Sequence, residues 1–475
     1  MPTPPFTNPK EPEELLDYVF KRLQYPKIPL RLLVVGRAGS GKSTFIRRLL
    51  KRLGGTLEVM NLTTRNTAAN ETGGQTVFKK LHIDYQNIEK VLETECKFYP
   101  RLGLVILDEI SLFYGALVDL LDKLIAKMKD AIGEMFGNVH IIMVGDFLQL
   151  ADKKDGAYMY DWDGFREFEI RFLSTNFRQA RDTDFCQRLD RWAVGLVNDD
   201  DANFLEERCV ANNPYTVQED VAAFYNNQKW DPVDSIILTS SNKDAINFTR
   251  KVLNGQGIHH LIETDVAIIK IVPDSPKQLI TFRPVEKPSV LVVGIKAQII
   301  FTKDTFEQTG THKIDRGTIG EISKITIVRN QIWAISLIIK GYNHPLTFQR
   351  ILVKTKKTKH ETESLAVFNF RNGIATTFNQ AQGRTLKRVM IDTSRGDLYP
   401  AQFYTGASRV CNADALHLTH LPSYETKALQ LVINPDKGAI DEIKKWKANF
   451  DLVRLPSDVA NVDHDDDGEN TPKPE

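Results

Sequence analysis

Short, unbroken apolar runs alternate along the chain with segments whose apolar residues recur every three or four positions. The runs at 32–35, 104–107 and 141–144 are each four residues long. Such runs are typical of strands that are buried on both faces of a parallel sheet. Residues 45–53 carry apolar side chains at helical spacing, and the segment 236–253 combines a run, a turn and an amphipathic helix. The pattern therefore predicts an α/β protein with parallel sheets.

The pattern changes between Val290 and Phe370. Short β-rich runs follow one another there, separated by clusters of Gly, Asn and Lys. Strands at this spacing, with turn residues between them, are typical of a small β-barrel. We therefore expect a β-rich module within an otherwise α/β chain.

Composition narrows the class of protein. The 475 residues are 42% hydrophobic and 26% charged, which excludes a mainly disordered or fibrous chain. The longest apolar stretch, at about 289–301, is interrupted by polar residues, so we expect no membrane span. The Pro-rich, acidic N-terminus lacks the pattern of a secretory signal. We therefore expect an intracellular protein of the nucleus or the cytoplasm.

Cysteine spacing and charge add two constraints. The four cysteines form no CxxC pair, which argues against a zinc site or a disulfide framework. The net charge is only +1, yet residues 21–57 hold ten Lys or Arg and no acid. Residues 347–388 hold nine bases against two acids, and the last eighteen residues hold seven acids. Solvated faces would explain any one such run equally well, but basic blocks beside the motifs described next favour a polyanionic partner.

A glycine-rich segment follows the first apolar run. Residues 36–44, GRAGSGKST, match the pattern GxxxxGK[ST] between a predicted strand and a predicted helix. The glycines allow backbone N–H groups to point at a phosphate, and the helix N-terminus adds its positive dipole. Lys42 would neutralise the outer phosphates of ATP, and the hydroxyl of Ser43 would ligate Mg²⁺. The predicted phosphate-binding residues are Gly36, Gly39, Ser40, Gly41, Lys42, Ser43 and Thr44.

Two further apolar runs end in polar residues. The second run is followed by Asp108 and Glu109, and the third leads to Gln149. Ligands of α/β proteins bind at the carboxyl ends of parallel strands. We therefore predict that Asp108 holds Mg²⁺, that Glu109 orients or deprotonates the attacking water, and that Gln149 contacts the γ-phosphate and this water.

The order of the motifs resembles that of superfamily-one helicases, and more narrowly that of the Pif (petite integration frequency) group of 5′-to-3′ DNA helicases, which includes a Helitron-transposon and viral branch. The chain has DEISL at 108–112 and GDFLQL at 145–150, where the group has DEISM and GDFRQLPPV. TTFNQAQGRTL at 376–386 and YTGASRV at 404–410 are similar to the group's TINKSQGQTL and YVALSRV. Residues 68–78, AANETGGQTVF, resemble AANNIGGQTIH. The chain departs from the superfamily in having no Gln upstream of the P-loop at the usual adenine-reading position.

The resemblance implies two RecA-like parallel-sheet P-loop domains, with a small β-barrel inserted in the second and a short wedge insertion in the first. The implied boundaries are 1–30 for an N-terminal extension, 31–168 for the first domain with its wedge at about 77–98, 169–293 and 370–435 for the second domain, 294–369 for the barrel, and 436–475 for a C-terminal helix and an acidic disordered tail.

The resemblance also implies roles for individual residues. Arg178 and Arg409 would act as arginine fingers that stabilise charge on the transferring phosphate, and Gly383 would contribute to the nucleotide site. The implied contacts with the nucleic acid are Thr76, Phe78, Asn242, Thr376, Thr377 and Gln382.

We therefore predict an ATP-dependent DNA helicase that uses ATP and Mg²⁺, translocates 5′-to-3′ on single-stranded DNA and unwinds forked DNA in replication, repair or recombination. We expect a monomer without membrane contact, whose acidic tail binds a protein partner. Two alternatives remain open: a viral-type RNA helicase of the same superfamily, and a nucleic-acid-binding protein with a vestigial ATPase. Asn379 and the GGQT segment favour the DNA group, and the filled catalytic positions argue against a vestigial site.

Overall fold

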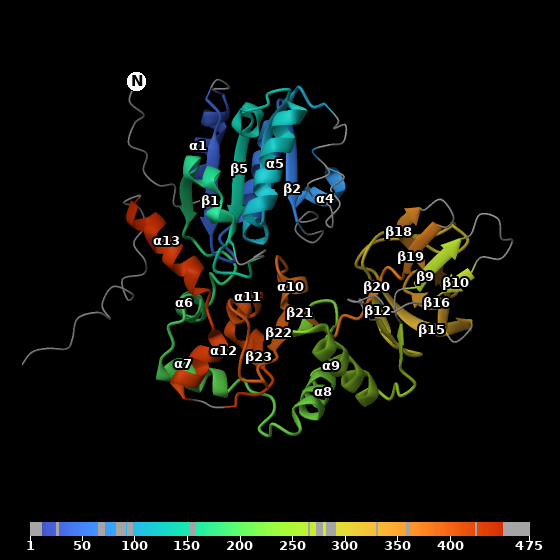
Figure 1. The fold of residues 1–475 in the computed structure, drawn as a ribbon. Helices are drawn as coiled ribbons and strands as arrows, with labels where there is room; N and C mark the ends of the chain where they lie inside the picture. Colours follow the sequence, from blue (N-terminus) through green and yellow to red (C-terminus); the bar gives the residue numbers. More distant parts are fainter. Residues whose placement is uncertain are drawn as a thin grey trace, which may run out of the picture. The chain divides into compact units, whose positions relative to one another are not determined.

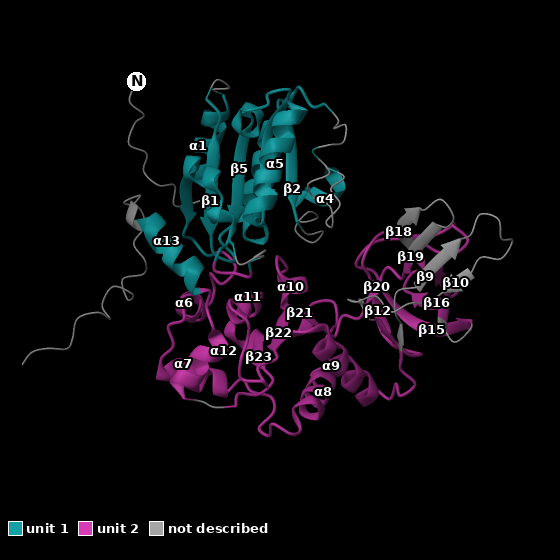
Figure 2. Cartoon of the chain, viewed as in Figure 1, with its two compact units in different colours: residues 1–147, 151–176, 437–475 teal, residues 148–150, 177–436 magenta. Residues whose placement is uncertain are grey.

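The computed structural model describes residues 12–24, 28–64, 72–81, 92, 98–151, 157–264, 267–271, 279–281, 291–328, 331–357, 362–422 and 425–449. The chain divides into two units (Figure 2). One unit comprises residues 1–147, 151–176 and 437–475, and the other comprises residues 148–150 and 177–436. Each unit contains a parallel sheet with helices beside it (Figure 1), so the predicted α/β class is confirmed.

The first unit is built on a six-stranded sheet of order β3-β2-β4-β5-β1-β6, in which every described pair is parallel. The apolar runs form its central strands because both faces of those strands are covered. Its elements are α1 (Pro12–Leu23), β1 (Arg31–Gly36), α2 (Lys42–Leu53), β2 (Glu58–Thr63), β3 (Gln75–Thr76), α4 (Val77–Lys80), β4 (Leu102–Asp108), η2 (Ile110–Leu112), α5 (Gly115–Met128), η3 (Met135–Asn138), β5 (His140–Gly145), η4 (Met159–Asp161), η5 (Asp163–Glu167), β6 (Glu169–Leu173) and α13 (Lys437–Asn449).

Three segments belong to this unit that we predicted to lie outside the first domain. The prediction of an N-terminal extension at 1–30 is wrong for α1, because its buried leucines share one core with Phe45 and Leu49 of α2. The boundary at 169 is wrong because β6 pairs with β1, and Tyr18 of α1 donates a hydrogen bond to the Glu169 carboxylate at 2.6 Å. The C-terminal helix α13 also packs here, since Trp446 is buried against aromatic rings of this unit.

The second unit contains a four-stranded parallel sheet of order β21-β7-β22-β23. Its strand β7 and helix α9 are the strand, turn and amphipathic helix predicted at 236–253. The elements around this sheet are α6 (Thr183–Trp192), α7 (Asp199–Glu206), α8 (Val217–Asn227), β7 (Ser235–Thr239), α9 (Asn242–Gly255), β21 (Ala375–Thr377), α10 (Phe378–Ala381), β22 (Arg388–Ile391), α11 (Gln402–Ala407), η6 (Ala413–Ala415), β23 (Leu416–Leu418) and α12 (Thr426–Ile433).

Antiparallel strands fill the chain between α9 and β21. They form a five-stranded sheet (β17-β16-β15-β12-β20), a four-stranded sheet (β10-β9-β19-β18) and two pairs (β11-β8 and β13-β14). The strands are β8 (Ile262–Thr264), β9 (Ala267–Ile271), β10 (Leu279–Thr281), β11 (Leu291–Val293), β12 (Gln298–Phe301), β13 (Thr305–Phe306), β14 (Lys313–Ile314), β15 (Ile319–Val328), β16 (Gln331–Ile339), β17 (Leu346–Gln349), β18 (Ile351–Lys357), β19 (Thr362–Val367) and β20 (Phe370–Arg371).

The β-rich region therefore begins earlier than the predicted residue 294. β9 pairs with β19, and β8 pairs with β11, so the strands at Ile262–Thr264 and Ala267–Ile271 already belong to these sheets. The strands β11, β12 and β16 share one continuous apolar core with helices α8 and α9. Most of the predicted wedge at 77–98 lies outside the described residues, apart from α4 and a few positions beside it.

Candidate nucleotide site and arginine cluster

The loop between β1 and α2 curls around its own lysine. The Nζ atom of Lys42 donates hydrogen bonds to the carbonyl oxygens of Gly36 at 2.6 Å and Arg37 at 2.9 Å. A Cβ atom at Gly36 would lie 2.3 Å from Ser40 Oγ, and Gly41 has a φ of 86°. Because both positions exclude ordinary side chains, the glycines of the motif are required by the shape of the loop.

The loop leads directly into the N-terminus of α2. The N–H of Phe45 donates the first hydrogen bond of the helix, to Gly41 O at 2.8 Å, and Gly41 provides no side-chain cap. The preceding N–H groups of the first turn therefore have no carbonyl one turn earlier to bond to. These groups and the helix dipole form a site suited to an anion.

Asp108 and Glu109 follow β4 directly. Glu109 has a φ of 56°, and its N–H donates a hydrogen bond to Asp108 Oδ1 at 2.9 Å. Burial and then the neighbouring charge of Glu109 raise the pKa of Asp108 to about 7, against the opposing effects of Glu109 N–H, Lys42 and a hydrogen bond with Thr72. The charge of Lys42 therefore lies near enough to this carboxylate to favour its ionised form.

Several buried polar atoms of this unit lack a hydrogen-bond partner among the described residues. Among them are Ser40 Oγ, Thr63 Oγ1, Thr64 Oγ1, Glu109 Oε2 and Ser111 Oγ. Thr63 lies opposite Asp108 in the pairing of β2 with β4. Leaving a buried polar group unsatisfied costs about 1–3 kcal/mol. Such a concentration beside a carboxylate is typical of a site that a polar ligand or a cation completes, so the residues fit a phosphate and a magnesium ion.

Gln149 belongs to the second unit, which corrects its predicted place in the first domain. Its Oε1 accepts a hydrogen bond from the guanidinium of Arg409 at 2.8 Å. The next residue, Leu150, donates its N–H to the hydroxyl of the buried Thr405 at 3.0 Å, and its carbonyl accepts from Gln382 at 3.5 Å. These side-chain contacts hold residues 148–150 against the second unit.

Arg178 and Arg409 lie close together in this unit. Arg409 is only 2% exposed, and its guanidinium donates to the Thr405 carbonyl and the Ser408 hydroxyl, both at 2.8 Å, as well as to Gln149. Arg178 donates to the carbonyl of Ser408 at 2.7 Å. The structure therefore brings together Gln149 and the two predicted arginine fingers, which we call the arginine cluster.

The predicted nucleic-acid contacts differ in accessibility. Asn242 is exposed at the start of α9, while Phe78 and Thr377 are half-buried. Thr76, Thr376 and Gln382 are buried. Thr76 caps α4 by accepting the N–H of Lys79, and Thr376 donates to Gln380 Oε1. Gly383 has a φ of 85°.

Three residues that the sequence motifs did not predict bond to parts of these sites. Thr72 bonds Asp108, and Gln179 and Asp182 contact the segment after Arg409. Gln179 directly follows Arg178 in the sequence, and this neighbour is the one sequence feature that could have pointed to it. No described helix has the length and the apolar character needed to cross a bilayer.

Comparison with known proteins gives consistent matches. Residues 11–182 match the model of the PIF1-like helicase family. The ATP-dependent DNA helicase PIF1 of Trypanosoma brucei brucei is 29% identical over 168 residues, which are 35% of this chain and 18% of that protein. PIF1 of Saccharomyces cerevisiae is 28% identical over 187 residues, 36% of this chain and 22% of that protein. The matched region thus spans about a fifth of these curated relatives.

Solved structures extend the likeness to most of the chain. The Pif1 helicase from Candida albicans has a TM-score of 0.63 and 17% identity, covering 90% of this chain and 98% of that one. The Pif1 helicase from Bacteroides in complex with ADP-AlF3 and single-stranded DNA has a TM-score of 0.64 and 19% identity, covering 92% and 97%. Residues 11–182 of this chain therefore match the PIF1-like helicase family, and about nine tenths of the chain share the fold of solved Pif1 helicases.

Proposed function

We propose that this protein is an ATP-dependent DNA helicase that moves along single-stranded DNA. The observation that carries the proposal is the combination of the curled P-loop around Lys42 with the buried acids Asp108 and Glu109 in one unit. A lysine among inward-pointing amides suits a polyphosphate, and two acids beside it suit a metal and a water molecule. The family match over this unit supports the assignment.

Each residue of the candidate nucleotide site would have a separate role in ATP hydrolysis. When Lys42 leaves the carbonyls of Gly36 and Arg37, its ammonium can neutralise the outer phosphates. Ser43 and Asp108 would hold Mg²⁺, which supplies charge neutralisation at the transferring phosphate. Glu109, whose Oε2 is buried without a partner among the described residues, would accept the proton of the attacking water.

We assign Gln149, Arg178 and Arg409 to the stabilisation of negative charge during phosphoryl transfer. Arginine is suited to this role because its planar, permanently charged group binds phosphate through several N–H donors. Its donation to neutral acceptors of the chain, two carbonyls, a hydroxyl and an amide, orients the Arg409 guanidinium without removing its charge.

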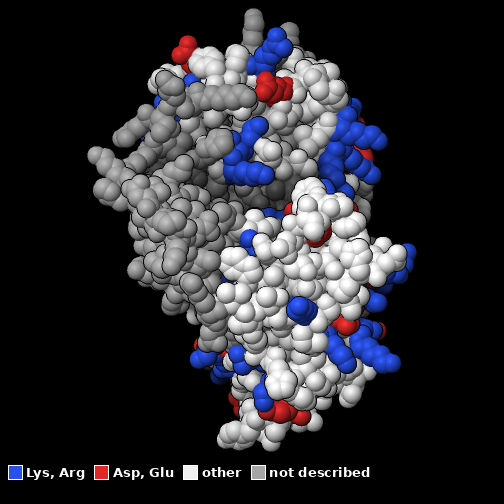
Figure 3. All heavy atoms as spheres, turned by 90° about the vertical axis from the view of Figure 1, so that its right-hand side faces the viewer, with Lys and Arg blue, Asp and Glu red and all other residues white. Residues whose placement is uncertain are grey.

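We assign DNA as the polyanion and 5′-to-3′ as the direction. Lys and Arg atoms cover more of the face in Figure 3 than Asp and Glu atoms do. The Bacteroides relative was solved with single-stranded DNA, and another Pif1 structure concerns forked double-stranded DNA. Thr76, Phe78, Asn242, Thr376, Thr377 and Gln382 are our candidate contacts. The direction rests on the motif resemblance alone.

We further propose that the motor acts as a monomer inside the cell, in the nucleus or the cytoplasm. The acidic tail that would bind a protein partner lies outside the described residues. A role in DNA replication, repair or recombination is the setting in which such a motor would act.

The test compares ATP hydrolysis and unwinding by wild type, Lys42→Ala and Glu109→Gln. We expect single-stranded DNA to stimulate hydrolysis more than RNA, and a 5′-tailed duplex to be opened while a 3′-tailed one is not. Both variants should lose unwinding. Stronger stimulation by RNA would support the RNA-helicase alternative, and absence of hydrolysis by wild type would exclude a motor.

A further inference from the structure

Three side-chain hydrogen bonds join the segment after β6 to the segment after α11. Arg178 donates to Ser408 O at 2.7 Å, and Gln179 Nε2 donates to Val410 O at 2.5 Å. Asp182 Oδ2 accepts the N–H of Ala413 at 2.8 Å. These pairs are separated by about 230 residues of sequence. Two of the bonds end on the backbone of Ser408 and Val410, on either side of Arg409, and the third ends on Ala413, a little further along the same segment. We call this arrangement the backbone clamp.

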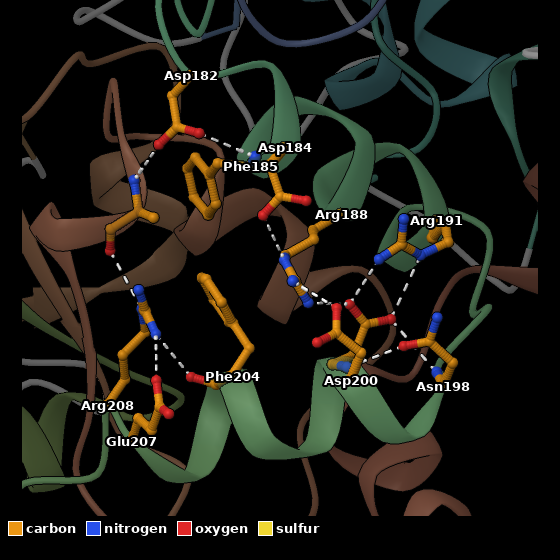
Figure 4. Close-up of polar contacts among 12 residues, drawn as sticks. Asp182, Asp184, Phe185, Arg188, Arg191, Asn198, Asp200, Phe204, Glu207 and Arg208 are labelled. Atoms are coloured by element: carbon orange, nitrogen blue, oxygen red, sulfur yellow. Dashed lines mark hydrogen bonds and ion pairs between the residues drawn. The ribbon is translucent and has the colours of Figure 1, made fainter.

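Asp182 serves two donors with its two oxygens. It is the N-cap of α6, where Oδ1 accepts the N–H of Phe185 at 3.0 Å, while Oδ2 accepts the N–H of Ala413 (Figure 4). The carbonyl of Ala413 accepts in turn from Arg208 Nε at 3.2 Å. Arg208 itself lies over the ring of Phe204, 3.4 Å from its centroid. Both polar groups of the Ala413 backbone are therefore fixed by side chains.

The helices behind the clamp are joined by a partly buried ion network (Figure 4). Arg188 of α6 donates to Asp200 at 2.5 Å and to the fully buried Asp201 at 2.9 Å, both on α7. Arg191 donates to the same Asp201 at 2.7 Å. Networks of buried charged groups of this kind are stable only when every member is satisfied, and they then hold the elements in one geometry. The clamp thus rests on a rigid support.

Resting on the function proposed above, we infer that Gln179 and Asp182 are positioning residues for Arg178 and Arg409. They bind the backbone that carries the arginines and do not contact the nucleotide. Loss of either bond leaves the segment 408–413 free to shift. A displacement of about 1 Å of a group that stabilises a transition state can cost as much as 10²-fold in rate. ATP and DNA binding, which use other residues, should change little.

Asp182→Asn is the selective test. Asparagine remains a good N-cap. However, the N–H groups of Phe185 and Ala413 bond different oxygens of Asp182, and the amide NH₂ that replaces one of these oxygens cannot accept either bond. Asp184→Asn is the matched control, because Asp184 lies in the first turn of the same helix, is largely exposed, and has no described bond to residues 408–413. Asparagine keeps an acceptor oxygen for Arg188, which also retains its bonds to Asp200 and Asp201, so the ion network should survive this change. Gln179→Met provides a second variant that removes the amide and preserves volume.

The measurements are kcat and KM of DNA-stimulated ATP hydrolysis, the Kd for single-stranded DNA, and the Tm. We expect kcat of Asp182→Asn and Gln179→Met to fall about tenfold, with KM and Kd within about twofold of wild type, which is the signature of a loss confined to the transition state. Asp184→Asn should retain wild-type kcat.

A double-mutant cycle separates positioning from general destabilisation. Asp182→Asn should reduce kcat no further once Arg178 and Arg409 are both replaced by alanine, because it acts through them. Wild-type kcat in Asp182→Asn, an equal loss in Asp184→Asn, or multiplicative losses in the cycle would each overturn the inference. A wild type without ATP hydrolysis would instead refute the proposed function.

Discussion

The candidate nucleotide site of the first unit and the arginine cluster of the second satisfy their polar atoms in opposite ways. In the first, hydroxyls and a carboxylate oxygen are buried without partners among the described residues, and Lys42 bonds carbonyls of its own loop. In the second, the buried guanidinium of Arg409 donates to acceptors supplied by the chain. The first arrangement leaves buried polar atoms that a ligand could satisfy, whereas the Arg409 guanidinium of the second already has acceptors within the chain.

The two regions should therefore differ in how mutation changes the stability of the protein. A group that a ligand completes is costly to the folded chain without that ligand, so its removal should not destabilise the protein. A group satisfied by the chain contributes to stability, and its removal strands its former partners. Mutations in the first region should therefore reduce activity without reducing stability, whereas mutations in the second should reduce both.

Glu109→Gln should give the largest change. We expect ATP turnover to fall by about 10²–10³-fold because the attacking water loses its base. The Tm without nucleotide should stay the same or rise, since a charge beside buried Asp108 is removed. Steady-state hydrolysis and thermal unfolding measure the two effects, and a lower Tm would show that the Glu109 carboxylate stabilises the ligand-free protein.

Arg409→Lys should reduce both activity and stability. Lysine has a single donor centre and cannot reach Gln149, Ser408 and Thr405 together. We expect a loss of about 2–4 kcal/mol in the free energy of unfolding, measured by chemical denaturation, together with at least tenfold slower turnover. Unchanged stability would show that the cluster is not completed by the chain.

Thr63→Val tests the buried hydroxyls of the first region and should change stability by a smaller amount. Valine has nearly the same shape and removes a buried hydroxyl that has no partner among the described residues. We expect the ligand-free protein to gain about 1 kcal/mol and to show a smaller rise in Tm on adding ATP and Mg²⁺. Destabilisation of the ligand-free protein would indicate that the hydroxyl is satisfied in solution.

The pH dependence of stability tests the position of Lys447 beside Arg37 of the P-loop, and we expect this effect to be the smallest. Burial, and then the charge of Arg37 in the P-loop, lower the pKa of Lys447 to about 8. Between about pH 8 and its ordinary value of 10.5 the unfolded chain binds more protons at this position, so its contribution to stability rises with pH across that window. Lys447→Met should abolish that rise in Tm, and an unaltered pH profile would contradict the assignment.

Much of the nucleotide site was predictable because its information is local. The P-loop pattern lies between a strand and a helix, and the acids directly follow another strand, so spacing alone predicts which residues meet at the sheet edge. Thr63 and Thr72 were missed because they carry no motif. The placement of Gln149 was wrong for a related reason: the bond to Arg409 spans 260 residues of sequence.

The boundaries of the units could not be predicted from local sequence patterns either. β6 and α13 have ordinary local patterns that would suit either unit, and only the pairing of β6 with β1 and the burial of Trp446 assign them to the first. The β-rich region was predicted from alternation and turn residues, but its start at β8 depended on pairing with β11.

The P-loop pattern, the acids after β4 and the alternation of strands and helices could all be predicted from the sequence, because each depends on residues that are close together in the chain. Long-range packing instead determines which unit Gln149, β6 and α13 join, and how Gln179 and Asp182 bind the backbone that follows Arg409. Those contacts join residues more than 130 positions apart, and such pairs are selected by the packing of whole elements rather than by any local pattern.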